Sequence, residues 1–215
     1  KSHILLVEDD FAELMLEELL SHYRHDLLEI SNFHNMKGES NIYEVSKRIS
    51  PKKDMKFLSV YDADQRGKPA VGENFPSVYL PSTANLAPEK DIIQYIEKNP
   101  AMYAYSLGVN VDDIELILAD FTEEHHDWFI ELHREFENNV AKCALREFKR
   151  KAIRCWILDN KEISEKFIFE LDNIENDIIA RLEKCTDTSK MFAVTRSGIS
   201  YEAKGVPVNI NMEEE

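Results

Sequence analysis

Positive charge is scarce in this sequence. The 215 residues include 26 basic and 41 acidic ones, which gives a formal net charge of -15 at pH 7. A long phosphate-binding surface normally needs an excess of basic residues, so the composition argues against a free-standing DNA-binding module. It leaves open an enzyme whose acidic centre is screened by metal ions, or one that binds DNA through another domain.

Cysteines and long apolar runs are also few. Cys143, Cys155 and Cys185 are odd in number and widely spaced, which fits neither a disulfide framework nor a zinc site. We expect free thiols in a reducing cytoplasm. No apolar stretch approaches the length of a transmembrane helix and no signal peptide is visible, so we expect a cytoplasmic protein without a membrane partner. No glycine-rich phosphate loop and no defensible Ser-His-Asp or Cys-His arrangement is present.

The first hundred residues alternate between short apolar runs and amphipathic segments. Strands are expected at residues 4–7, 27–30, 55–61 and 77–80, and helices at 11–22, 42–49 and 88–98. This alternation predicts an α/β domain over residues 1–100, with a parallel sheet flanked by helices.

After about residue 100 the pattern becomes helical, with almost no glycine or proline. We predict a helical appendage over residues 101–186, with helices at 111–119, 123–142, 144–158 and 164–184. The remaining segment, residues 187–215, is predicted to form a short C-terminal β-hairpin with a disordered end. Its strands are expected at residues 191–195 and 199–203.

Acidic residues follow two of the predicted strands. Glu8, Asp9 and Asp10 follow the first, and Asp62 and Asp64 follow the third. In open α/β sheets, ligands bind beyond the carboxyl ends of such strands, and Mg²⁺ prefers oxygen ligands. Because side chains alternate along a strand, we expect Asp62 and Asp64 to face Glu8 together. In a plainer interpretation, Asp9 or Asp10 caps the next helix, with Asp10 a cap rather than a ligand, and Asp62 and Asp64 are solvated turn residues.

The first cluster resembles the opening of a response-regulator receiver domain. Asp62 would be the phospho-acceptor, Ser82 or Thr83 the hydroxyl residue and Lys90 the lysine. The spacing fits poorly, because the segment from Asp62 to Ser82 leaves no room for the helix and strand that should intervene.

Both clusters together resemble the Toprim domain of topoisomerases, primases and OLD-family nucleases. Glu8 matches the glutamate of that pattern, and Asp62, Asp64 and Gly67 match its Asp-x-Asp-x-x-Gly. Leu80-Pro81 and Pro88-Glu89-Lys90 are similar to OLD-type members. The resemblance implies a metal-dependent endonuclease that uses Mg²⁺ or Mn²⁺ and cuts DNA in preference to RNA. It also implies a homo-oligomer with an ABC-type ATPase domain, either preceding this chain or in trans, and a role in anti-phage defence. An inactive Toprim module that serves assembly is the alternative.

By resemblance, Asp62 and Asp64 are metal ligands and Glu8 is a ligand or a general base. Two departures from the Toprim pattern leave the ligands of a second metal ion undetermined. Asp9 stands where glycine is usual, and Ala12 stands where many OLD nucleases carry an acid. Asp9 or Glu13 would replace the missing ligand, or the domain would use one metal.

OLD-type nucleases also place a C-terminal lysine near the scissile phosphate. Lys190 and Lys204, together with Arg196, are the candidates for this phosphate contact. The basic run at residues 146–154 admits two interpretations, contact with a phosphate backbone or a solvated helix face.

Overall fold

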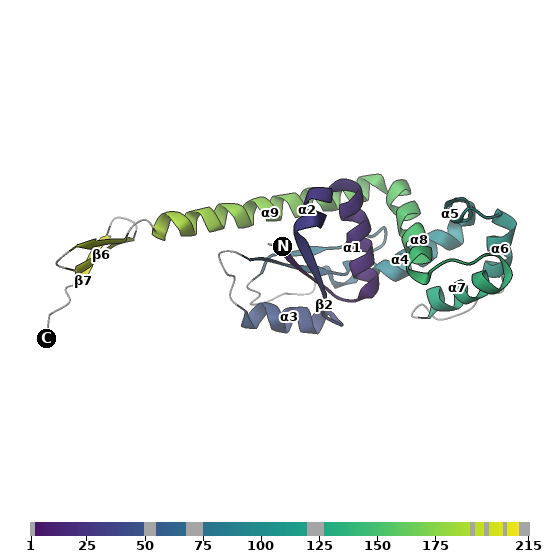
Figure 1. The fold of residues 1–215 in the computed structure, drawn as a ribbon, viewed down its shortest axis with the longest axis horizontal. Coiled ribbons are helices and arrows are strands. Elements are labelled where there is room, and N and C mark those ends of the chain that lie inside the picture. The colour runs from purple at the N-terminus through teal and green to yellow at the C-terminus, as the bar shows by residue number, and fades with distance from the viewer. Residues whose placement is uncertain are drawn as a thin grey trace. The chain divides into compact units, whose positions relative to one another are not determined.

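The chain forms two compact units, Lys1–Leu171 and Asp172–Glu215. The computed structural model describes residues 3–49, 55–67, 75–119, 127–189, 192–195, 198–203 and 206–210. The first unit is α/β, with a four-stranded parallel sheet flanked by helices, as predicted (Figure 1). The second unit holds the end of helix α9 (Lys161–Ser189) and an antiparallel sheet of β5 (Phe192–Thr195), β6 (Gly198–Ala203) and β7 (Val206–Ile210). Lys190, Arg196 and Lys204 lie outside the described residues, and the predicted boundary at residue 100 stays a prediction.

The parallel sheet has the strand order β2-β1-β3-β4. Its strands are β1 (His3–Val7), β2 (Ser31–Asn35), β3 (Lys56–Tyr61) and β4 (Ser77–Tyr79). From β1 the chain passes to β2 on one side, and then returns across β1 to β3 on the other side. The carboxyl ends of β1 and β3 are therefore the topological switch point, the place where open α/β sheets bind ligands.

Helices cover both faces of this sheet. Helix α1 (Asp10–Tyr23) lies on one side and α3 (Glu39–Arg48) on the other (Figure 1). Successive side chains of β1 point to opposite faces. Leu6 packs in a cluster with Ile42 of α3 and Tyr61 of β3. Burial on both faces explains why β1 and β3 are mostly apolar, with Ser59 as the one polar residue inside β3 after Lys56.

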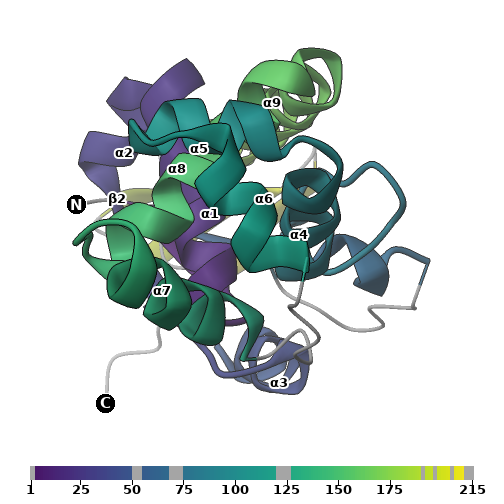
Figure 2. The same ribbon diagram turned by 90° about the vertical axis from the view of Figure 1, so that its right-hand side faces the viewer.

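A helical layer follows the sheet in the same unit. It contains α4 (Pro88–Lys98), α5 (Pro100–Leu107), α6 (Val111–Ala119), α7 (Trp128–Asn139) and α8 (Leu145–Asp159). Helix α8 packs against α1, α4, α5 and α7, and the layer faces the viewer in Figure 2. The Tyr103 hydroxyl of α5 donates a hydrogen bond to the Phe148 carbonyl of α8 at 2.9 Å. Helix α5 was not predicted, whereas α6 and α8 match their predicted ranges within about one residue.

None of the helices in the described ranges is long and apolar enough to cross a lipid bilayer. Among the cysteines with described side chains, Cys155 is a buried free thiol and Cys143 a half-buried one.

The strand predicted at residues 27–30 is wrong. These residues end a short helix, α2 (His25–Ile30), whose Leu27 is buried, and β2 begins at Ser31. The segment Ser31–Asn35 is polar because β2 is an edge strand that pairs with β1 alone. It therefore lacks the apolar run that marks the strands buried at the centre of the sheet.

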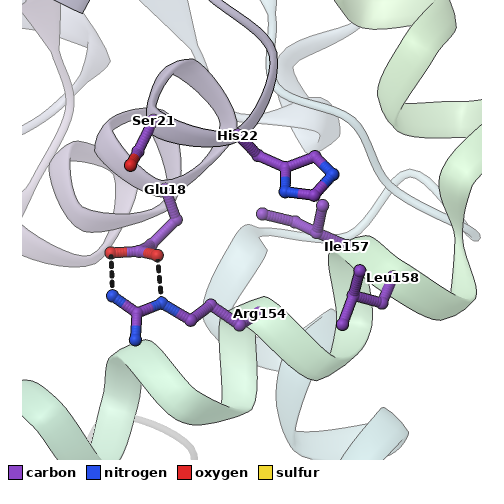
Figure 3. A pocket seen from close by; sticks show the side chains of 6 residues that line it. All are labelled: Glu18, Ser21, His22, Arg154, Ile157 and Leu158. Atoms are coloured by element: carbon purple, nitrogen blue, oxygen red, sulfur yellow. Dashed lines mark hydrogen bonds and ion pairs between the residues drawn. The ribbon is translucent and has the colours of Figure 1, made fainter. Parts of the chain in front are cut away.

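The basic run of α8 binds acidic residues of α1. Arg146 pairs with Glu17, while Arg150 and Arg154 both pair with Glu18, at 2.5 and 2.6 Å respectively. Figure 3 shows Arg154 facing the Glu18 carboxylate across the two helices. Glu18 is only 3% exposed, so its charge is compensated almost entirely by these two guanidinium groups. The two interpretations of this run, phosphate contact or solvated face, therefore both miss its main role as a helix-to-helix clamp.

We predict that Glu18→Gln lowers the free energy of unfolding by about 2 kcal/mol, because it removes the charge that satisfies two arginines. Glu17→Gln is the matched control, and should cost less than about 1 kcal/mol because its pair with Arg146 is more exposed. Urea denaturation of both variants measures the difference. Equal losses would show that Glu18 is not the centre of the clamp.

Candidate functional site

Glu8 and Asp62 meet at the carboxyl ends of β1 and β3. The parallel register places Val7 opposite Val60, so the residues that follow lie side by side. The backbone N–H of Asp62 donates a hydrogen bond of 2.8 Å to Oε1 of Glu8. Each side chain is 6% exposed. The fold thus brings two predicted site residues together as a buried carboxylate pair.

The environment of this pair disfavours negative charge. Burial raises the pKa of Glu8 to about 7, against the lowering effect of the N–H of Asp62, and the charge of Glu39 adds to the rise. Burial and the neighbouring charge of Glu8 raise the pKa of Asp62 to about 8. The Oδ1 atom of Asp62 is buried and has no hydrogen-bond partner. A buried acceptor without a donor is costly, and a bound cation is one way to satisfy it.

Asp64 lies nearby but at the surface. The chain leaves the extended conformation after Asp62 and forms a 3₁₀ turn at Ala63–Gln65, which leaves Asp64 exposed. The expectation that strand alternation would aim Asp62 and Asp64 together is therefore wrong. The charge of Asp64 still contributes to the raised pKa of both Glu8 and Asp62. Gly67 has φ +79°, a left-handed conformation that accounts for glycine at the end of this motif.

Asp9 is the N-cap of α1. Its Oδ1 accepts hydrogen bonds from the backbone N–H groups of Phe11 at 2.9 Å and Ala12 at 2.8 Å. Asp10 is already the first helical residue and accepts a hydrogen bond of 2.6 Å from the side chain of Asn35. Of the two predicted capping candidates, the structure selects Asp9, and the prediction that Asp10 is the cap is wrong.

Glu13 lies one turn further along α1, among other charges. Burial raises its pKa, and the charged groups that act on it are those of Glu17, Arg146, Asp10 and His34. Neither Glu8 nor Asp62 is among these groups. The role of Glu13 as a metal ligand stays a prediction.

Three charged residues at this edge of the sheet were missed by the site prediction. Glu39 begins α3, and its charge raises the pKa of both Glu8 and Asp62. Glu89, in the first turn of α4, has its pKa raised to about 7 by burial, with Lys149 opposing and Asp9 adding to the rise. Lys149 of α8 lies over the rings of Phe11 and Phe129, 5.5 and 5.7 Å from their centres. Placing β2 correctly would have revealed Glu39, because it follows that strand by four residues.

The site has a preformed pair but not a preformed triad. Among the described residues, no group of three or more His, Cys, Asp or Glu side chains is arranged to hold a metal ion. The donors of the pair nevertheless fit a divalent cation, because they are carboxylate oxygens and one of them lacks a partner.

A hollow elsewhere on the unit contains none of the predicted site residues. It has a volume of about 340 Å³ and lies between α1 and α8 (Figure 3). Its lining residues are Glu18, Ser21, His22, Arg154, Ile157 and Leu158. Glu18 is eight residues beyond the start of α1, so at 1.5 Å per residue the hollow begins roughly 12 Å along the helix from the strand ends.

Comparisons with known proteins identify no family for this chain. No family model matches it, and no curated protein matches it. A solved structure, the C-terminal region of the OLD protein of Xanthomonas campestris pv. campestris, is similar at 14% identity and a TM-score of 0.34, over 80% of this chain and 97% of that one. A similarity with so low a TM-score supports no argument about fold or function.

The raised pKa values predict a stability that falls with pH in the absence of metal. Unfolded carboxyl groups ionise near pH 4, while folded Glu8 and Asp62 ionise only near 7 and 8. Between these limits the folded chain holds protons that the unfolded chain releases, so each rise in pH favours unfolding. The stability associated with these two groups is fully present below about pH 4 and is lost as the pH approaches 8.

Asp62→Asn should therefore raise the melting temperature at pH 8 in EDTA by about 4 °C or more, and change it little at about pH 3.5, where Asp62 is largely protonated in both the folded and the unfolded chain. Thermal denaturation followed by circular dichroism at the two pH values measures this. A variant that is less stable at pH 8 would contradict the raised pKa of Asp62.

Proposed function

We propose that this chain is a Toprim-type, metal-dependent nuclease that hydrolyses phosphodiester bonds, in DNA rather than in RNA. The observation that carries the proposal is the buried Glu8–Asp62 pair at the switch point of the sheet, with Oδ1 of Asp62 unpartnered. Two acids held out of water beside each other are unfavourable for stability. Their presence at the place where such sheets bind ligands is best explained by a cation that neutralises them.

Glu8 and Asp62 would hold Mg²⁺ or Mn²⁺, with Asp64 turning in from the exposed 3₁₀ turn. Oxygen ligands from carboxylates are what both cations accept. A bound cation would neutralise charge on the attacked phosphate and make water a better nucleophile. Asp9, whose Oδ1 caps α1, and Glu13 remain further candidates for a ligand of this cation.

In this proposal Glu8 would also move a proton. Its Oε1 is held by the N–H of Asp62, which fixes the carboxylate on the end of a rigid strand. In the metal-free site the pKa of Glu8 is about 7, near the optimum for a general base that works at neutral pH, and a bound cation would lower it. The same residue can therefore serve as a ligand or as the base that activates the attacking water, the two roles implied by the Toprim resemblance.

Positive charge for the substrate phosphates would come from few residues. Arg66 follows the Asp-x-Asp pair, and one of its side-chain nitrogens donates to the carbonyls of Tyr79 and Leu80 at 3.3 and 3.4 Å. Lys149 reaches the start of α1 from the helical layer. Unlike Arg150 and Arg154, neither residue forms an ion pair within the described part of the chain. Lys190 and Lys204 remain further candidates for the phosphate contact.

The larger assembly follows from the OLD resemblance alone. We propose that the chain works with an ABC-type ATPase domain, as a homo-oligomer in the cytoplasm, in anti-phage defence. An inactive Toprim module that serves assembly would have the same partners but would not need the acidic pair.

The receiver alternative receives little support from the residues after β4. The Thr83 hydroxyl and backbone N–H both donate to the buried carboxylate of Asp91, at 2.6 and 2.7 Å. The Ser82 hydroxyl oxygen accepts hydrogen bonds from the backbone N–H groups of Ala84 and Leu86. Both hydroxyl groups thus stabilise the loop before α4.

Nicking of supercoiled plasmid in the presence of Mn²⁺ tests the proposal. The unaltered protein should nick the plasmid, and Asp62→Ala/Asp64→Ala should reduce the rate by about 10³-fold or more, because it removes two of the proposed ligands. Asp112→Ala/Asp113→Ala removes the same charge from the exposed start of α6 and should keep full activity.

Equal activity of the Asp62/Asp64 double variant and the unaltered protein would sink the nuclease proposal. If the unaltered protein neither nicks plasmid DNA nor cleaves RNA, the assembly module would be favoured. Labelling of Asp62 by acetyl phosphate would favour a receiver.

A further inference from the structure

The acids expected to be metal ligands on helix α1 are engaged in part by other groups. Asp9 is engaged as the N-cap, and position 12 is an alanine. The charges of Glu17, Arg146, Asp10 and His34 act on Glu13. Two carboxylates and the exposed Asp64 leave a hard divalent cation short of protein ligands, so the neighbouring elements need to be considered.

The loop between β2 and α3 is tied directly to the backbone of the site. The N–H of Met36 donates to the carbonyl of Val7 at 2.9 Å, and the N–H of Gly38 donates to the carbonyl of Glu8 at 2.8 Å. The Asn41 side chain donates hydrogen bonds to the carbonyls of Met36 and Lys37. The position of this loop relative to Glu8 is therefore fixed by backbone hydrogen bonds.

The conformation of this loop is unusual. Lys37 has φ +57° and Gly38 has φ +119°, both in the region that L residues rarely adopt. At Gly38 the absence of a side chain makes the conformation accessible, and the turn lets its N–H reach Glu8. The chain then enters α3, and its first residue is Glu39.

Glu39 brings an uncompensated negative charge to this point. Its side chain is exposed, and within the described part of the chain that side chain forms no hydrogen bond or ion pair. Its charge is the strongest of the neighbouring charges that raise the pKa of Glu8, and it also acts on Asp62. An acid in the first turn is favoured by the helix dipole, but that gain is typically below 1 kcal/mol. The dipole alone does not explain an acid placed against two buried acids.

We propose that Glu39 is a ligand of the divalent cation held by Glu8 and Asp62, so that β1, the loop after β2, and β3 each contribute one carboxylate. This proposal rests on the proposed function, since it concerns the same cation. Two observations support it together: the backbone hydrogen bond from Gly38 to Glu8, which holds the start of α3 beside the pair, and the unpartnered buried Oδ1 of Asp62. The exposed Glu39 side chain would turn toward the pair, because among the described residues no three carboxylates are already arranged to hold a metal ion.

Calorimetric titration of the full chain with Mn²⁺ tests this ligand without any measurement of activity. Glu39→Gln should weaken Mn²⁺ binding by about tenfold or more, since even indirect partners of metal ligands have effects of this size. Glu39→Asp keeps the charge but shortens the side chain, and should also weaken binding by about tenfold. Glu44→Gln is the matched control, because Glu44 is on the same helix, is exposed and pairs with Arg48 at 2.9 Å. Its binding should stay within about twofold of the unaltered protein.

The outcomes separate this proposal from the nuclease proposal. Unaltered binding by Glu39→Gln, with binding lost in Asp62→Asn, overturns the role of Glu39 and leaves the Glu8–Asp62 cation site intact. Weak binding by Glu39→Gln with full binding by Glu39→Asp also overturns it, because charge without ligation is then sufficient. Absence of Mn²⁺ binding by the unaltered protein overturns both proposals. Circular dichroism of each variant confirms that it is folded.

Discussion

One backbone hydrogen bond, from the N–H of Asp62 to the carboxylate of Glu8, joins the ends of the two central strands. The two residues are 54 positions apart in the chain, and only the parallel pairing of β1 with β3 brings them together. That pairing requires a crossover through β2 and α3, which in turn places Glu39 at the same edge. The capped start of α1 fixes Asp9 beside them. The acidic edge is thus a consequence of sheet topology, and no local segment could form it alone.

Much of the fold could be predicted from the sequence because the central strands and most helices carry strong periodic signals. The apolar run of β1 is continuous over residues 4–7, and that of β3 is interrupted only by the buried Ser59 after Lys56. Strand β2 has no such signal. It lies at the edge of the sheet and pairs with β1 alone, so its sequence can remain polar. Leu27 misled the prediction because one buried leucine fits the inner face of a short helix as well as a strand.

The site was predictable in part, for physical reasons that differ between residues. Glu8 and Asp62 follow apolar strands directly, so their meeting follows from parallel pairing. The exposure of Asp64 does not, because it depends on where the backbone turns into a 3₁₀ helix. The effect of the Glu39 charge on Glu8 and Asp62 was not predicted, because the second strand was expected at residues 27–30 and not at Ser31–Asn35. The arginines of α8 resembled a phosphate-binding run until their partners on α1 were known.

The buried Glu8–Asp62 pair would also make the stability of the fold depend on the concentration of divalent cation. A cation that binds the native pair, and not the unfolded chain, adds RT ln(1 + [cation]/Kd) to the folding free energy, about 2.7 kcal/mol at a hundredfold excess over Kd. The lifetime of the folded protein would then follow the supply of free divalent cation. Chelation would then lower resistance to proteolysis.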